Sequence, residues 1–120
     1  MTIRIGIDKA ALYRRQADAI TAERDRRIEA GFRFLGDVFQ FDAQSKSRIT
    51  GAATLAGFAI SAGAQPGDLR WNGGAVAFTW LSRDNVNVPL DALSMFAMGQ
   101  VAAEHERAHI FAARAIKDMR

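Results

Sequence analysis

The stretch that decides the predicted fold is Ile49-Thr-Gly-Ala-Ala-Thr-Leu-Ala-Gly-Phe-Ala-Ile-Ser-Ala-Gly63. No charged residue occurs between Arg48 and Asp68. A helix that is apolar on nearly every face has to be buried on nearly every face. We therefore predict that residues 42–63 form the central helix of the fold.

Both ends of this segment carry signals that start or stop a helix. Asp42 can act as the N-cap, because its carboxylate accepts a hydrogen bond from a backbone N–H of the first turn. Gly63 can close the helix in the left-handed conformation, and Pro66 keeps it from resuming. Gly51, Gly57 and Gly63 recur along the segment, and we expect them to let neighbouring elements pack closely.

The sequence before this helix predicts a strand and a long helix. Residues 2–7 carry isoleucine at every second position, the pattern of a strand that pairs within the domain or with another chain. Asp8 is the predicted N-cap of a helix over residues 9–30, which Gly31 ends. The apolar stripe of that helix comprises Tyr13, Ala17, Ile20 and Ile28.

Two further regions predict antiparallel strands. Phenylalanines alternate on both sides of Gly36–Asp37 within residues 32–41, which predicts a hairpin. A three-stranded meander follows the central helix, and Pro89 favours an edge position for its third strand. Trp71 and Trp80 are expected to cover the core face of that sheet. The three strands are residues 69–71, 76–82 and 86–90.

The last predicted element is a helix capped by Asp91 that runs to about Asp118, with Leu90 and Met95 in staple positions. The sum is an α+β fold in which three helices pack against a small antiparallel sheet. Its order is helix, hairpin, buried helix, three-stranded meander, helix. We assign residues 8–120 to this single domain and residues 1–7 to an N-terminal strand or arm.

Composition restricts the possible functions. The chain has 120 residues, a net charge of +3 and no cysteine, which excludes disulfides, thiolate zinc sites and cysteine nucleophiles. Arg24, Arg26 and Arg27 alternate with acidic residues, as on a solvated helix face, so nucleic acid is not an expected partner. The charge-free run is too short and too rich in Gly, Ser and Thr for a membrane span. The N-terminus lacks the apolar region of a signal peptide, so we expect the protein in the cytosol.

One stretch, His105-Glu-Arg-Ala-His109, matches the H-E-x-x-H pattern of zinc hydrolases. Two histidines one helical turn apart can share a zinc ion, and the glutamate can deprotonate a bound water. A catalytic site needs a third protein ligand. The chain has no further histidine: Ala115 stands at the metzincin position, and Asp118 lies on the same helix. A zinc-dependent hydrolase that uses His105, Glu106 and His109 is therefore the least favoured hypothesis.

Packing is the favoured explanation for these histidines. They belong to a series with alternating spacings of three and four, which forms one seam of a packed helix. The series is Met95, Met98, Ala102, His105, His109, Ala112, Ile116 and Met119. No phosphate-binding loop or nucleophile elbow occurs in the sequence. We therefore predict no catalytic, cofactor-binding or metal-binding residues, no cofactor, no small-molecule substrate and no enzymatic activity.

Several segments together resemble one uncharacterised domain family of tailed phages and prophages. They are Ala22–Phe32, Ile49–Ala53, Ala64–Trp71 with Gly73–Gly74, and Ala108–Asp118. The resemblance extends over nearly the whole chain from Asp8. Such domains are often found at the C-terminal end of tail-fibre or tail-fibre-assembly-like proteins. The resemblance implies a context rather than an activity, and His105, unlike His109, is not expected to be a family feature.

The resemblance leads to our main hypothesis, a non-enzymatic phage or prophage protein that acts by protein–protein contacts in tail or tail-fibre assembly or structure. Its partners would be copies of itself, in a homo-oligomer, or other phage tail proteins. Its location would be the host cytoplasm or the virion. The predicted contact surfaces are the Ile3–Ile7 strand and the Met95–Met119 seam. The alternative is a small prophage protein with a regulatory or host-interaction role.

Overall fold

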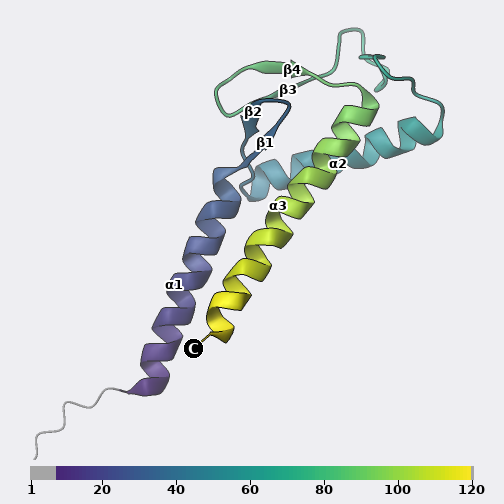
Figure 1. Ribbon diagram of the computed structural model, residues 1–120. Helices are drawn as coiled ribbons and strands as arrows, with labels where there is room; N and C mark the ends of the chain where they lie inside the picture. The colour runs from purple at the N-terminus through teal and green to yellow at the C-terminus, as the bar shows by residue number, and fades with distance from the viewer. Residues whose placement is uncertain (1–7, 120) are drawn as a thin grey trace, which may run out of the picture.

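The computed structural model describes residues 8–119 and has the predicted α+β class. Figure 1 shows α1 and α3 side by side in opposite directions, while α2 crosses the first half of α3. The predicted strand of residues 2–7 lies outside the described residues. The elements are α1 (Lys9–Ala30), β1 (Phe32–Phe34), β2 (Asp37–Phe39), α2 (Ala43–Ser61), β3 (Thr79–Leu81), β4 (Asn87–Pro89) and α3 (Ala92–Asp118).

Helix α1 has the predicted bounds, because local signals fix its ends. The backbone N–H groups of Ala10 and Ala11 donate to Asp8 Oδ1, and the Gly31 N–H donates to Ile28 O. The predicted apolar stripe was wrong at Tyr13, which is 53% exposed, although Ile28 is buried. The reason is that α1 packs along α3 on one narrow side and leaves the rest of its circumference in water.

Strands β1 and β2 form the predicted first hairpin, in which Phe32 pairs with Phe39. The turn is Leu35–Gly36, one residue earlier than predicted, and its φ angles are +51° and +83°. Two positive φ angles match the turn to the right-handed twist of the strands. The stacked rings of Phe32 and Phe39 are buried together with Phe41, so the hairpin supplies a large part of the core.

Helix α2 is not the central buried helix that its composition predicts. It buries Ile49, Ala53 and Ala56, whereas Leu55 is 62% and Phe58 is 69% exposed. An uncharged helix face can be buried with little desolvation cost, but it stays exposed unless another element of the fold covers it. In the described part of the chain, α2 packs on α3 and its outer side faces water. None of the described helices combines the length and the hydropathy needed to cross a membrane.

Helix α3 takes the central position, because it contacts α1, α2 and β1. The first half of its predicted seam is buried, at Met95, Met98 and Ala102. In the second half Ala113 is buried instead of Ala112, and Ile116 is 51% exposed. The shift follows from geometry, since a straight helix drifts by about 20° per heptad from a 3.5-residue repeat. The predicted seam is therefore correct from Met95 to His109, since His105 and His109 are half-buried, and it shifts beyond His109.

A glycine of α3, and not those of α2, provides the close approach between the two helices. A Cβ atom added to Gly99 would overlap the Cβ atom of Ala53. A Cβ at Gly51 would meet nothing within 4 Å, and one at Gly57 would make an ordinary contact with a phenylalanine ring. The prediction that these glycines allow close packing was thus wrong for Gly51, and also for Gly63, where an added Cβ would meet nothing within 4 Å.

Both predicted ends of α2 are confirmed. Ser45 N–H donates to Asp42 Oδ1 at 2.8 Å. At the other end Gly63 has φ +100°, and Ala64 N–H donates to Ala59 O at 2.9 Å. This is the Schellman pattern, in which a left-handed glycine lets the following N–H reach a carbonyl of the last turn. The role of Gly63 is therefore to end the helix.

The second sheet has two strands, so the predicted three-stranded meander was wrong. Strand β3 pairs with β4. The expected first strand, residues 69–71, is joined to the β3–β4 hairpin by one described backbone hydrogen bond, from Phe78 N–H to Leu69 O. The chain cannot extend that pairing because it turns at once, with Gly73 N–H donating to Arg70 O. Pro89 lies in β4, which has one strand neighbour, as expected of an edge.

The two tryptophans pack on the core, as predicted. Trp71 donates its indole N–H to Leu90 O at 3.0 Å. Its ring centroid lies 4.7 Å from that of Phe78, which in turn lies 6.0 Å from that of Trp80. The two hairpins are joined separately, by a hydrogen bond from Arg83 N–H to Val38 O at 2.8 Å.

Asp91 connects the start of α3 to a loop that is distant in sequence. Its Oδ1 accepts a hydrogen bond from Ser94 N–H and its Oδ2 accepts one from Gly67 N–H, both at 2.8 Å. These bonds, that of Gly67 first, lower the pKa of Asp91 below its usual value. A lowered folded-state pKa stabilises the fold above the unfolded-state pKa, and this stability is lost as pH falls through the folded-state value.

We expect Asp91→Ala to lower the free energy of unfolding at pH 7 by about 1–2 kcal/mol, the usual range for a lost N-cap. The difference between variant and wild type should shrink below about pH 4, where the carboxyl of the unfolded wild type becomes protonated, and disappear as pH falls through the lower folded-state pKa. Urea unfolding at pH 7 and at pH 3, followed by circular dichroism, measures both. Asp42→Ala is the control, since Asp42 caps α2 without the bond to the loop. A difference for Asp91→Ala that is the same at both pH values would contradict the assignment.

Candidate functional site

The H-E-x-x-H stretch lies in the middle of α3, where α1, the first hairpin and α2 meet. His105 Nε2 lies 3.0 Å from Ile28 O, in the last turn of α1. A carbonyl oxygen can only accept, so Nε2 carries the proton in this contact. The His105 ring also lies 6.0 Å from the Phe32 ring and 6.2 Å from the Phe41 ring. His105 therefore holds the end of α1 against α3.

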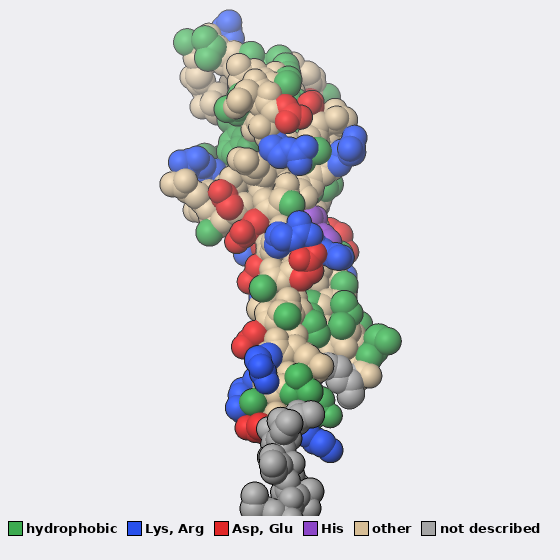
Figure 2. Space-filling view, turned by 90° about the vertical axis from the view of Figure 1, so that its left-hand side faces the viewer, with side chains coloured by type: hydrophobic (Ala, Val, Ile, Leu, Met, Phe, Trp, Pro, Cys, Tyr) green, Lys and Arg blue, Asp and Glu red, His purple; other side chains and the backbone are tan. Residues whose placement is uncertain are grey.

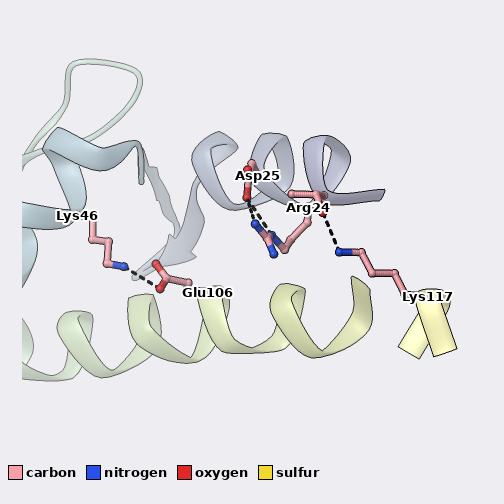
Figure 3. Close-up of polar contacts among 6 residues, drawn as sticks. Arg24, Asp25, Lys46, Glu106 and Lys117 are labelled. Carbon is pink, nitrogen blue, oxygen red and sulfur yellow. Dashed lines mark hydrogen bonds and ion pairs between the residues drawn. The ribbon is translucent and has the colours of Figure 1, made fainter. Parts of the chain in front are cut away.

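The glutamate of the stretch is engaged elsewhere. Glu106 accepts a hydrogen bond from Lys46 Nζ at 2.8 Å, and this ion pair links α3 to the start of α2 (Figure 3). Lys117 reaches from the end of α3 to Thr21 Oγ1 of α1, also at 2.8 Å. The same view shows Arg24 and Asp25 paired with each other on α1. Glu106 and Lys117 of α3 thus connect this helix to α2 and α1, respectively.

The two histidines lie together, but they lack a third ligand. The ring centroids of His105 and His109 are 4.7 Å apart. Burial, followed by the positive charges of His105 and Arg27, lowers the pKa of His109 below its usual value. Among residues 8–119, no three His, Asp or Glu side chains come close enough to share a metal ion. Asp118, the acid considered from sequence, pairs with Arg114 at 3.1 Å.

The surface of α1 carries charges of both signs. Figure 2 shows basic and acidic side chains interspersed along the face on which α1 lies. Glu23 binds Arg26 and Arg27, and the hydrogen bonds from these two arginines lower the pKa of Glu23 to about 2. Because the arginines are paired locally, this face presents no continuous positive patch of the kind that binds phosphate backbones.

A different surface emerges where α2 crosses α3. Residues 49–61 of α2 contain no charge, and neither do residues 92–103 of α3, which pack against them. Leu55 and Phe58 are exposed on α2, and Leu93 and Phe96 are each 40% exposed on α3. We call the outer side of these two segments the uncharged α2–α3 face.

A shallow groove runs along this face between the two helices. Its volume is about 280 Å³. It is lined by Thr50, Ala53, Thr54, Phe96, Gly99, Gln100 and Ala103. Sequence reasoning identified the charge-free run of α2 but not the matching run of α3, although a count of charges along residues 92–103 would have found it. The sequence also predicted that residues 49–61 lie in the core, whereas about half of these residues are exposed.

No curated protein and no solved structure shows significant similarity to this chain. A family model described as a domain of unknown function, DUF4376, matches residues 11–119. This match extends from the first turn of α1 to the end of α3 and so includes all the elements described above. The chain therefore belongs to the DUF4376 family of domains of unknown function.

Proposed function

We propose that this is a non-enzymatic phage or prophage protein that acts by protein–protein contacts in tail or tail-fibre assembly or structure. The phage context rests on the resemblance of the segments quoted above. The uncharged α2–α3 face is the single observation that supports a role in contacts. We propose that copies of the same chain or other tail proteins cover it.

The physical argument starts from the composition of the face. The buried centre of a protein–protein interface is depleted of charged residues and enriched in aromatic ones. On this face Phe58 and Phe96 are exposed beside a groove, and no charged side chain belongs to either helical segment. Large exposed apolar patches of this kind mark interaction sites. Ordinary solvated helices instead carry alternating charges, as α1 does.

This proposal replaces one of the two contact surfaces predicted from sequence. The Met95–Met119 seam cannot serve over its first half, because Met95, Met98 and Ala102 are buried inside the chain. The other predicted surface, Ile3–Ile7, lies outside the described residues. The uncharged α2–α3 face remains open to a partner, because Leu55, Phe58, Leu93 and Phe96 are exposed in the described fold.

The test is the solution mass over a wide range of protein concentration. We expect the wild type to form a dimer or trimer, and the variant Leu55→Gln/Phe58→Gln to remain monomeric. Glutamine preserves helix propensity, and both positions are exposed, so the variant should keep its stability within about 0.5 kcal/mol. Val76→Gln is the matched control, because Val76 is 76% exposed but belongs to neither helical segment and does not line the groove.

A second arm addresses partners other than a second copy. If the wild type is monomeric at every concentration, it is co-expressed with the products of neighbouring tail genes. Co-purification that is lost in Leu55→Gln/Phe58→Gln and kept in Val76→Gln would support the proposal. Monomers without any such partner, or complexes unaffected by the double substitution, would contradict it.

A further inference from the structure

A second hollow lies on the other side of α2, between its first turns and the second hairpin. Its volume is about 550 Å³, roughly twice that of the groove on the uncharged α2–α3 face. Pockets that bind small molecules fall in the range of about 300–1,000 Å³. The hollow is lined by Gln40, Ser45, Arg48, Thr79, Trp80, Leu81, Ser82, Arg83 and Asn85. We call it the two-arginine hollow.

Backbone contacts make the walls of the hollow well defined. Arg83 N–H donates to Val38 O at 2.8 Å, which ties the second hairpin to the first. Ser82 is buried, and its Oγ accepts a hydrogen bond from Val86 N–H at 3.1 Å. Asn85 adopts the left-handed conformation, with φ +63°, to close the turn. Its N–H donates to Ser82 O at 3.0 Å.

The lining is cationic and rich in hydrogen-bonding groups. Arg48 and Arg83 are its charged members, and no carboxylate belongs to it. Arg48 makes no hydrogen bond or ion pair with any residue that the structure describes, and Arg83 lies 3.8 Å from Asp84, a long contact. Five neutral polar side chains, the Leu81 side chain and the Trp80 indole complete the wall.

Two acidic groups lie near the hollow without lining it. Asp42 is held as the cap of α2 by Ser45 N–H at 2.8 Å. Hydrogen bonding to Ser45 is the main cause that lowers the pKa of Asp42, and the positive charge of Arg48 adds to it. Asp84 has a side chain that is 74% exposed, so water screens its interaction with Arg83. Both arginines therefore keep donors for a ligand.

We propose that the two-arginine hollow binds a small oxyanion, a carboxylate or a phosphate, borne on a polar ring such as a sugar. The planar guanidinium group presents paired N–H donors that match both oxyanions. The neutral side chains can hydrogen-bond hydroxyl groups, and an indole offers an apolar surface to a sugar ring. The site does not depend on the uncharged α2–α3 face or on the proposed role in assembly.

The experiment is a titration of ¹⁵N-labelled full-length protein at low ionic strength, followed by NMR. The probes are glucuronate for a carboxylate, glucose 6-phosphate for a phosphate, and glucose as the neutral sugar. We expect the Trp80 indole signal to shift with at least one anion and to stay constant with glucose at the same concentration. The anion that binds more tightly shows whether the hollow prefers a carboxylate or a phosphate.

Variants test whether the two arginines are responsible. Arg48→Gln and Arg83→Gln should each weaken binding about tenfold, as expected for the loss of one charge-assisted hydrogen bond. Arg33→Gln is the matched control, since Arg33 is exposed on β1 and does not line the hollow. No shift with either anion would overturn the proposal. So would binding of glucose with equal affinity, or an equal loss in Arg33→Gln, which would indicate a general charge effect.

Discussion

Gly31→Ala is expected to destabilise the fold by at least about 3 kcal/mol. Gly31 has φ +104° and ψ −178°, a backbone conformation that is essentially restricted to glycine. A Cβ atom there would also overlap the carbonyl oxygen of Phe39, a backbone atom that cannot move without shifting β2. The backbone strain and the steric overlap act together, because neither can be relieved while the junction between α1 and β1 stays closed. Chemical denaturation followed by circular dichroism measures the loss.

Gly36→Ala is the matched control for this prediction. Gly36 also has a positive φ, +83°, but nothing lies within 4 Å of the place where its Cβ would stand. Only the conformational cost remains, about 1–2 kcal/mol for an L-residue in the left-handed region. A Gly31→Ala variant that loses no more stability than Gly36→Ala would show that the close approach to Phe39 is absent in solution.

Gly99→Ala should cost about 1–3 kcal/mol, the usual range for overpacking a core. The added methyl group would overlap the Cβ atom of Ala53, which has no rotamer to move into. The substitution would also raise helix propensity, which alone favours Ala by about 1 kcal/mol. Gly51→Ala isolates that second effect, because nothing lies within 4 Å of its Cβ, and it should be neutral or stabilising. The same substitution, Gly→Ala, is therefore expected to lower the free energy of unfolding on α3 but not on α2.

Moving the methyl group across the interface provides the decisive comparison. Ala53→Gly removes the atom that Gly99→Ala would overlap, so the double variant should recover to within about 1 kcal/mol of wild type. A double-mutant cycle of unfolding free energies measures this coupling. Additive effects of the two substitutions would mean that α2 and α3 do not cross at these residues.

The parts of the fold that were predicted correctly depend on neighbours in sequence. Asp8, Asp42 and Asp91 each cap a helix through donors within three residues, so the local pattern contains the capping bonds, and only the further bond of Asp91 to Gly67 is non-local. Gly31 and Gly63 end helices for the same reason. The first hairpin follows from the alternation of its phenylalanines on either side of a two-residue turn.

The parts that were predicted wrongly depend on contacts between residues that are distant in sequence. The exposure of Phe58 is decided by whether another element covers α2, and composition cannot supply that information. The missing third strand reflects a turn at Arg70–Gly73 that competes with pairing to Phe78. Tyr13 has the helical spacing of the apolar stripe, but in the described part of the chain the packing of α1 on α3 leaves its side chain 53% exposed.

The candidate sites show the same division. The H-E-x-x-H pattern is local and was visible in the sequence, but its meaning depends on Ile28 and Lys46, which come from other helices. The two-arginine hollow was not visible, because Arg48 and Arg83 belong to segments separated by most of α2 and a long loop. No spacing rule connects them, so only the fold brings them together.

The bond between Gly67 and Asp91 has a consequence for how the connection from α2 to β3 can vary. Together with the bond between Leu69 and Phe78, it divides a long connection into short closed segments. Residues 70–77 lie between the two partners of the second bond, Leu69 and Phe78, and so form an excursion whose ends are already held together. Lengthening such a loop costs little closure entropy, about 0.6 kcal/mol per doubling. Insertions of extra sequence around Asn72–Val76 should therefore be tolerated in members of this family, while the helices and both hairpins keep their arrangement.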